Sequence, residues 1–258
     1  MSTVHATAIV SKSASVADDA TVGAYTIIGD DVVIGSGTRI DSHVVVNGPT
    51  VIGRDNHIYQ FASVGDDPQD KKYADEPTTL TIGDRNTIRE FCTVSRGTVQ
   101  GDGETTMGDD NWIMAYVHIA HDCHIGSNTI FANNATLAGH VHIGDWVILA
   151  GFSGAHQFCR IGAHAFLGMY SGVSRDVPPY TMVFGTPGVP RGINSEGLKR
   201  RDFDTQQIRN IKEAYRTIYR KGLKLDAAIE QLEQRVSDQP ELAILLESLR
   251  SSERGIVR

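Results

Sequence analysis

Seven of the ten histidines fall between residues 118 and 164, and this stretch is the first place where the chain could do chemistry. Neutral imidazole has a reference pKa of about 6.5, so a histidine is suited to remove a proton near neutral pH. The cluster favours either a general base in acyl transfer or a three-histidine zinc site of the kind found in gamma-type carbonic anhydrases. A non-catalytic β-solenoid scaffold is a third alternative, but it leaves the cluster unexplained. The seven residues are His118, His121, His124, His140, His142, His156 and His164.

Several of these residues recur at a spacing of 18. His121, Gly139 and Gln157 are separated by 18 residues each, and the same spacing relates Asp122 to His140. In a coil with 18 residues per turn, such residues would lie one above another at about 4.8 Å per turn. We therefore expect His121, His140, His156 and Gln157 to converge within about 10 Å. The Gly139 N–H, with no side chain beside it, would be placed to stabilise an oxyanion.

The hydrophobic pattern predicts such a coil. Every sixth residue from Val10 to Val64 is Val or Ile, and the period returns in phase at Ile82, Ile88 and Val94. It resumes one residue out of phase from Met107 to Val173. Neither the period of an α-helix nor the alternation of a twisted sheet gives this pattern. It indicates a mainly β fold, with three short strands per turn stacked as a parallel β-helix.

Interruptions of the pattern predict the domain organisation. Residues 65–79 and 95–106 are polar or glycine-rich insertions within a β-helix that spans residues 1–190. Pro178 and Pro179 predict the end of the regular coil. Residues 191–258 predict a helical domain, in which Asp204 caps a first helix together with Gln207 and further helices cover 226–236 and 240–251.

Composition limits the function classes. The net charge of −7 argues against general nucleic-acid affinity. Residues 1–190 carry a net charge of −10 and residues 191–258 one of +3, so the tail is suited to an acidic partner. Cys92, Cys123 and Cys159 share no CxxC spacing, which argues against disulfides and a thiolate zinc site. We find neither a membrane span nor a signal peptide, and we expect a cytoplasmic protein.

Three stretches are more specific than the repeats. They are His118-Ile119-Ala120-His121-Asp122-Cys123, Ala132-Asn133-Asn134-Ala135-Thr136-Leu137-Ala138-Gly139-His140-Val141 and Asn194-Ser195-Glu196-Gly197-Leu198-Lys199-Arg200-Arg201. With them, the chain resembles the bacterial acyl-[acyl-carrier-protein]:UDP-N-acetylglucosamine O-acyltransferases, which are hexapeptide-repeat proteins. The resemblance implies a left-handed coil, a homotrimer with sites between chains, and no metal or redox cofactor. The implied reaction transfers a 3-hydroxyacyl chain from acyl carrier protein to the 3-hydroxyl of UDP-N-acetylglucosamine, the first step of lipid A biosynthesis.

The resemblance also implies roles for individual residues. His121 would be the general base, Asp122 would orient it, and the Gly139 N–H would hold the oxyanion. Residues that contact the sugar and acyl groups would be Asp70, Lys72, His118, His140, His156 and Gln157. Residues that hold the nucleotide and diphosphate would be Asn194, Glu196, Arg200 and Arg201.

Three further expectations follow from the resemblance and the charge pattern. Met169 corresponds to the residue that closes the acyl groove, which predicts a chain shorter than 14 carbons. Ser95 stands where the family usually has His, so we assign the 95–106 loop no catalytic role. The basic tail predicts that acyl carrier protein docks on the helical domain, with contacts from Arg209, Arg216, Arg220 and Lys221.

Overall fold

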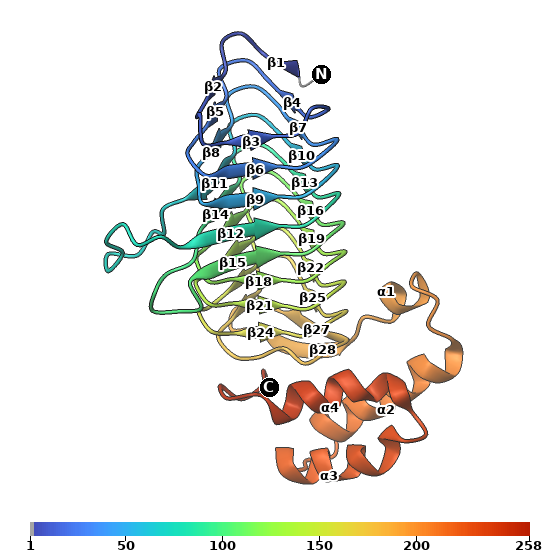
Figure 1. Ribbon diagram of the computed structural model, residues 1–258. Helices are drawn as coiled ribbons and strands as arrows, with labels where there is room; N and C mark the ends of the chain where they lie inside the picture. Colours follow the sequence, from blue (N-terminus) through green and yellow to red (C-terminus); the bar gives the residue numbers. More distant parts are fainter. Residues whose placement is uncertain (1–2) are drawn as a thin grey trace.

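The computed structural model describes residues 3–258 as a three-sided prism of short strands with helices at its C-terminal end (Figure 1). Strands one turn apart pair in parallel, and Val4 lies beside Val22, which confirms the coil of 18 residues. Across the first insertion Ile52 pairs with Ile82, and across the second Ile82 pairs with Met107. The insertions therefore lengthen single turns without disturbing the stack.

Three sheets form the sides of the prism. Sheet A contains β1 (Thr3–Val4), β4 (Thr21–Val22), β7 (Arg39–Ile40), β10 (His57–Ile58), β13 (Thr87–Ile88), β16 (Trp112–Ile113), β19 (Ile130–Phe131), β22 (Ile148–Leu149), β25 (Phe166–Leu167), β27 (Thr181–Phe184) and β28 (Val189–Ile193). Sheet B contains β2 (Ile9–Val10), β5 (Ile27–Ile28), β8 (Val45–Val46), β11 (Ser63–Asp66), β14 (Thr93–Ser95), β17 (His118–Ile119), β20 (Thr136–Leu137), β23 (Gly154–Ala155) and β26 (Gly172–Val173). Sheet C contains β3 (Ser15–Val16), β6 (Val32–Ile34), β9 (Thr50–Ile52), β12 (Thr79–Ile82), β15 (Glu104–Met107), β18 (His124–Ile125), β21 (His142–Ile143) and β24 (Arg160–Ile161).

The core of the prism is the stack of inward residues that the six-residue period predicts. Ile28, Ile58, Ile88 and Leu137 are all at most 1% exposed. Burying an aliphatic side chain of this size contributes about 1.5–3 kcal/mol. Because each turn contributes such residues from all three sides, the core continues along the prism.

The chain turns at three corners, which we name by the sheets they join: A–B, B–C and C–A. Corner residues take a left-handed backbone conformation, with φ of 57° at Asp122, 62° at His140 and 66° at Phe158. These three residues lie on successive turns of the B–C corner. Both insertions also leave the prism at this corner, because each follows a strand of sheet B and precedes a strand of sheet C.

The coil continues past Pro178 and Pro179, so the expected end at these prolines is wrong. Val177 bridges Ile161 in parallel, and β27 pairs with β25. The two prolines occupy the C–A corner, where a missing N–H interrupts no strand ladder. Tyr180 completes that corner with a left-handed φ of 68°.

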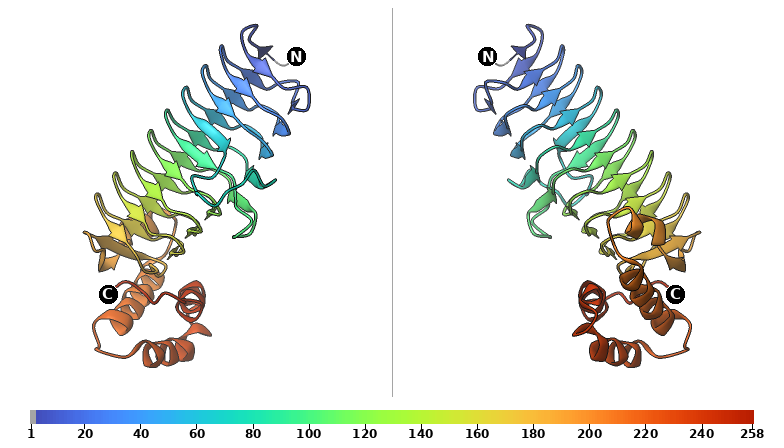
Figure 2. Two further views of the ribbon diagram at one scale, coloured as in Figure 1. Left: turned by 90° about the vertical axis from the view of Figure 1, so that its left-hand side faces the viewer. Right: turned by 90° about the vertical axis from the view of Figure 1, so that its right-hand side faces the viewer.

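The helical domain begins after β28, which pairs antiparallel with β27. It contains α1 (Ser195–Lys199), α2 (Thr205–Tyr219), α3 (Leu225–Val236), the 3-10 helix η1 (Pro240–Leu242) and α4 (Ala243–Arg250). The predicted capping box between Asp204 and Gln207 is confirmed. Figure 2 shows α2, α3 and α4 below the last turns of the prism, and the C-terminal tail returns to it where Ile256 bridges Asp176. None of the helices within residues 3–258 is both long and apolar enough to span a membrane.

Candidate active site

His121 and Asp122 form a hydrogen-bonded pair at the B–C corner. The His121 Nδ1 lies 2.7 Å from the Asp122 Oδ2. Neighbours on a regular strand point to opposite faces, so this contact requires the left-handed corner conformation of Asp122. Because the pairing uses Nδ1, the Nε2 of His121 is the nitrogen that can take a proton from a substrate.

The Asp122 carboxylate is held by a loop to which the sequence analysis gave no catalytic role. Thr98 lies in the second insertion, and its N–H and hydroxyl donate to Asp122 at 2.9 and 2.7 Å. Burial alone would raise the pKa of Asp122, but the hydrogen bonds from His121 and Thr98 outweigh it and leave the pKa lowered. The loop thus contributes to the lowered pKa of the carboxylate that pairs with His121, and no sequence signal singled out Thr98.

Gly139 lies directly beneath the His121 ring. A Cβ at this position would lie 2.5 Å from the ring Cε1 and 2.7 Å from Nε2, so any side chain would displace the imidazole. Within residues 3–258 the Gly139 N–H makes no hydrogen bond. An unpaired amide beside the reactive nitrogen is available for an oxygen that gains charge.

Two further histidines surround the pair. His140 packs edge-on against His121, with ring centroids 5.0 Å apart, and stacks on Phe158 at 4.4 Å. Burial lowers the pKa of His140, and the charges of Asp122 and, more weakly, Asp70 oppose that shift. His118 accepts or donates a 2.6 Å hydrogen bond with the Thr93 hydroxyl, and burial lowers its pKa.

The other predicted sugar and acyl contacts lie at the same corner but are less enclosed. His156 and Gln157 are exposed one turn beyond Gly139, where the Phe158 N–H donates to the Gly139 carbonyl. In the first insertion the Asp70 carboxylate accepts from the Lys72 N–H at 3.0 Å. The Lys72 side chain is exposed, and the described part of the chain contains no ion pair that involves it.

One group of described side chains could share a metal ion. Ligand atoms of His121, Asp122 and His140 all lie within 4.8 Å of one another. Within residues 3–258 no set of three histidines is assembled in this way. The third member is a carboxylate that already accepts hydrogen bonds from Thr98, which suits proton transfer better than a three-histidine zinc site.

The predicted nucleotide residues lie on another side of the prism. They border a hollow on sheet A, where strands β19, β22, β25 and β27 form an apolar floor. Asn194 caps α1 by accepting from the Gly197 N–H at 3.1 Å, while Arg200 and Glu196 are exposed. The residues that the sequence predicted at the rim of this hollow are Asn194, Glu196, Arg200 and Arg201.

Met169 lies at the A–B corner after β25, and its side chain is 58% exposed in the single chain. Its outward position agrees with the expectation that it projects from the prism. Sheet B separates it from the B–C corner that carries His121.

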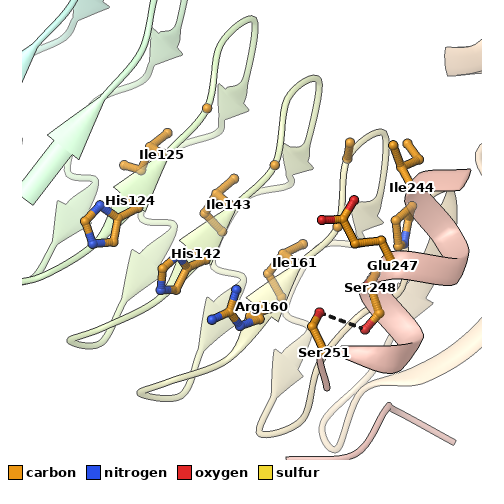
Figure 3. Close-up of a pocket in the computed structure, with 15 residues that line it drawn as sticks. His124, Ile125, His142, Ile143, Arg160, Ile161, Ile244, Glu247, Ser248 and Ser251 are labelled. Carbon is orange, nitrogen blue, oxygen red and sulfur yellow. Dashed lines mark hydrogen bonds between the residues drawn. The ribbon is translucent and has the colours of Figure 1, made fainter. Parts of the chain in front are cut away.

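A groove lies between sheet C and α4 (Figure 3). His124, His142 and Arg160 project into it from successive strands, opposite Ile244 and Glu247 of α4. The His124 and His142 rings stack at 4.8 Å, as the 18-residue spacing predicts. Burial lowers the pKa of His142 to about 4, so this ring is neutral at physiological pH. No individual role for these three residues was expected from the sequence.

Known proteins similar to this chain match it over its whole length. Residues 104–139 match the bacterial transferase hexapeptide family, and residues 176–257 match a family described as UDP-N-acetylglucosamine O-acyltransferase, domain 2. The acyl-[acyl-carrier-protein]–UDP-N-acetylglucosamine O-acyltransferase of Janthinobacterium sp. (strain Marseille) is 59% identical over 100% of both chains. That of Stenotrophomonas maltophilia (strain K279a) is 56% identical over 99% of this chain and 97% of the relative.

Solved structures of the same family superimpose on this chain. The UDP-N-acetylglucosamine O-acyltransferase of Moraxella catarrhalis superimposes with a TM-score of 0.98 at 47% identity, over 99% of each chain. The Francisella novicida UDP-N-acetylglucosamine acyltransferase gives 0.97 at 45%, over 99% of this chain and 94% of the other. The left-handed parallel β-helix is confirmed, and the carbonic anhydrase and scaffold alternatives are not supported. The chain belongs to the acyl-[acyl-carrier-protein]–UDP-N-acetylglucosamine O-acyltransferase family.

Proposed function

We propose that this chain transfers a 3-hydroxyacyl group from acyl carrier protein to the 3-hydroxyl of UDP-N-acetylglucosamine, the first step of lipid A biosynthesis. The observation that carries the proposal is the His121–Asp122 pair above Gly139. The substrates are those for which relatives up to 59% identical are named.

The reaction needs one proton acceptor and no cofactor chemistry. His121 Nε2 takes the proton of the sugar 3-hydroxyl as that oxygen attacks the thioester carbonyl carbon. The carbonyl oxygen becomes an oxyanion, which the Gly139 N–H stabilises. The C–S bond then breaks, the ester forms, and the thiolate of the carrier protein receives the proton from His121. Asp122 stabilises the imidazolium between the two transfers.

The sugar nucleotide would lie between the two groups of residues already described. Asp70, Lys72, His118, His140, His156 and Gln157 would contact the sugar and the acyl group near His121. At the sheet A hollow, a diphosphate would be bound by arginine, because the planar guanidinium donates several hydrogen bonds. Arg200 and Arg201 would take this role, with Asn194 and Glu196 near the nucleoside.

A homotrimer would bring these groups together. In a three-sided prism, the B–C corner faces away from sheet A, so a single chain places His121 and the sheet A hollow on opposite sides. A substrate that contacts both groups must therefore lie between two chains. Rotational symmetry repeats this contact three times and closes the assembly.

Exposed aromatic residues support the orientation of the chains in the trimer. One ring per turn stacks along the A–B corner, with centroids 4.8–5.3 Å apart within each run. This aromatic ladder consists of Tyr25, His43, Phe61, Phe91 and Tyr116, followed after one turn by Phe152 and Tyr170. On the turns that precede Trp146, the C–A corner instead carries charged residues such as Arg85 and Asp110. An exposed apolar strip of this kind marks an interface, so we place the A–B corner towards the threefold axis.

The carrier protein would dock on the helical domain. Arg209, Arg216, Arg220 and Lys221 are exposed on or directly after α2. Arg209 approaches Glu213 at 4.0 Å, and the other three make no ion pair within residues 3–258. Their positive charge is available to an acidic partner and would speed its encounter.

The decisive experiment is incubation with UDP-N-acetylglucosamine and 3-hydroxyacyl carrier proteins of 10, 12 and 14 carbons, followed by mass spectrometry. We expect a nucleotide product that carries one acyl group as an ester on the 3-oxygen. The His121→Ala protein is the control. Absence of product with every donor, or equal product from the control, would contradict the proposal.

A further inference from the structure

His164 contacts two of the residues to which nucleotide binding is assigned. It lies at the C–A corner with a left-handed φ of 63°. Its carbonyl oxygen accepts from the Asn194 side-chain amide at 3.1 Å, and its ring Nδ1 lies 3.1 Å from the Arg201 Nη1. A single corner residue of the prism thus reaches both ends of the short α1 segment.

The second contact defines which nitrogen of His164 carries the proton. A guanidinium has donors and no acceptor, so Nδ1 must be the unprotonated nitrogen of a neutral ring. Burial, and then the positive charge of Arg201, lower the pKa of His164 to about 4. At physiological pH the ring is therefore neutral, and its Nδ1 can accept a hydrogen bond.

Neighbouring aromatic rings hold His164 and Arg201 in place. The His164 ring lies between Trp146 and Tyr180 in a nearly parallel stack, at 6.4 and 5.5 Å. Phe203 packs edge-on against it at 5.2 Å. The Arg201 guanidinium lies over the Trp146 ring, 4.9 Å from its centroid. Arg201 is therefore fixed through one N–H and one face.

Arg201 also lines the sheet A hollow. Asn194 and Trp146 line it too, whereas His164 is not among the residues that line it. A guanidinium has five N–H donors, and His164 uses one of them. A fixed guanidinium loses less conformational entropy when it binds a phosphate than a mobile one does.

We propose that His164 is a positioning residue for the sugar nucleotide: through its ring nitrogen and its carbonyl oxygen it presents Arg201 and Asn194 to the substrate. The inference rests on the proposed function, because it takes the sheet A hollow as the nucleotide site. His164 touches neither the acyl donor nor the reacting atoms in this account.

The test compares two substitutions that suit the corner backbone. His164→Phe keeps an aromatic ring but removes the acceptor, and phenylalanine already occupies this conformation at Phe152 and Phe158. His164→Asn restores an acceptor oxygen near the place of Nδ1, and asparagine tolerates a positive φ. We expect His164→Phe to raise KM for UDP-N-acetylglucosamine about tenfold, the effect of one lost hydrogen bond to a charged group. KM for the acyl donor and kcat should change less than twofold, and His164→Asn should recover most of the loss.

Arg201→Ala, alone and combined with His164→Phe, separates the possible outcomes. If His164 acts through Arg201, the double variant should bind UDP-N-acetylglucosamine no more weakly than Arg201→Ala in calorimetric titration. If Arg201→Ala weakens binding and His164→Phe does not, the positioning role is wrong and the proposed function stands. If Arg201→Ala itself leaves binding unchanged, the sheet A hollow is not the nucleotide site. The nucleotide site given under the proposed function and the positioning role of His164 are then both wrong. Thermal unfolding of each variant identifies losses that come from the fold.

Discussion

At the catalytic corner, the backbone conformation of one residue decides which side chains can meet. Asp122 has a left-handed φ of 57°, and this turns its carboxylate to the Nδ1 of the preceding His121. Asparagine and aspartate adopt this conformation more readily than most residues do. The carboxylate is then fixed from behind by Thr98. The pair is therefore rigid before any substrate binds.

This geometry predicts unequal effects of two substitutions. His121→Ala removes the proton acceptor and should lower kcat at least 100-fold, within the range for general base catalysis. Asp122→Asn keeps the base and should lower kcat less, because it impairs only the orientation of His121 and the stability of the imidazolium. Steady-state kinetics with unfolding curves provides the measurement. Near-normal turnover of His121→Ala would remove His121 from the role.

Gly139 offers a test that removes no polar group. A methyl group at this position would overlap the His121 ring, so Gly139→Ala should lower kcat about 100-fold by moving the base. Gly29→Ala is the matched control, because it lies on an early turn and its added Cβ would meet the Asn47 side chain at 3.2 Å. Equal kinetics of the two variants would show that the ring is free to move aside.

At the scale of elements, the insertions and corners decide what surrounds the base. The buried Arg96 of the second insertion hydrogen-bonds the Tyr73 hydroxyl of the first at 2.9 Å, so the two loops form one unit. That unit brings Thr98 behind Asp122 and leaves Asp70 close enough to His140 to affect its pKa. The loop that carries Ser95 thus has a structural part in the site.

The A–B corner carries the prediction for acyl chain length. Met169 projects there and would block the last methylenes of a 14-carbon chain in a groove between chains. Each methylene left unburied is worth about 0.8 kcal/mol, so a few would disfavour that chain more than tenfold in kcat/KM. Met169→Gly should shift the preference among donors of 10, 12 and 14 carbons towards the longer ones. Wild-type preference for 14 carbons, or an unchanged preference in the variant, would refute this role.

At the scale of the whole molecule, the corner that carries His121 and the sheet A hollow that carries Arg201 lie on opposite sides of one prism. This separation predicts complementation between inactive variants. In an equal, random mixture of His121→Ala and Arg201→Ala chains, about a quarter of the sites between chains would combine an intact His121 with an intact Arg201. We therefore expect co-expressed or refolded mixtures to recover about a quarter of wild-type activity. Mixtures as inactive as the separate variants would place the whole site within one chain.

The charge difference between prism and tail predicts how the carrier protein associates. Salt screens exposed charges, so raised ionic strength should increase KM for the carrier protein more than KM for the sugar nucleotide. Arg216→Glu should have the same selective effect at low salt. Lys12→Glu is the matched control, because it makes the same change in charge on an early turn of the prism. Equal effects of salt on both substrates would contradict docking on the tail.

Much of this arrangement was determined by the sequence alone, because the six-residue period converts position in the chain into position in space. Arithmetic on that period placed Val22 beside Val4, His142 beside His124, and Gly139 beneath His121. The helix cap at Asp204 and Gln207 was equally local and was also predicted. The contacts in the coil join residues one turn apart, where the pattern repeats, and the helix cap joins residues three positions apart.

Only the tertiary structure decided the contacts between the repeats and the segments that do not repeat, which are the insertions and the helical domain. Nothing in the pattern relates Thr98 to Asp122, because an insertion has no repeat that fixes its path. The same holds for the contacts of His164 with Asn194 and Arg201, which join the prism to a helical domain. Even the prolines at 178 and 179 misled, since their effect depends on whether they meet a strand or a corner. A repeat determines its own geometry, whereas irregular segments are positioned by packing that is established only in the folded chain.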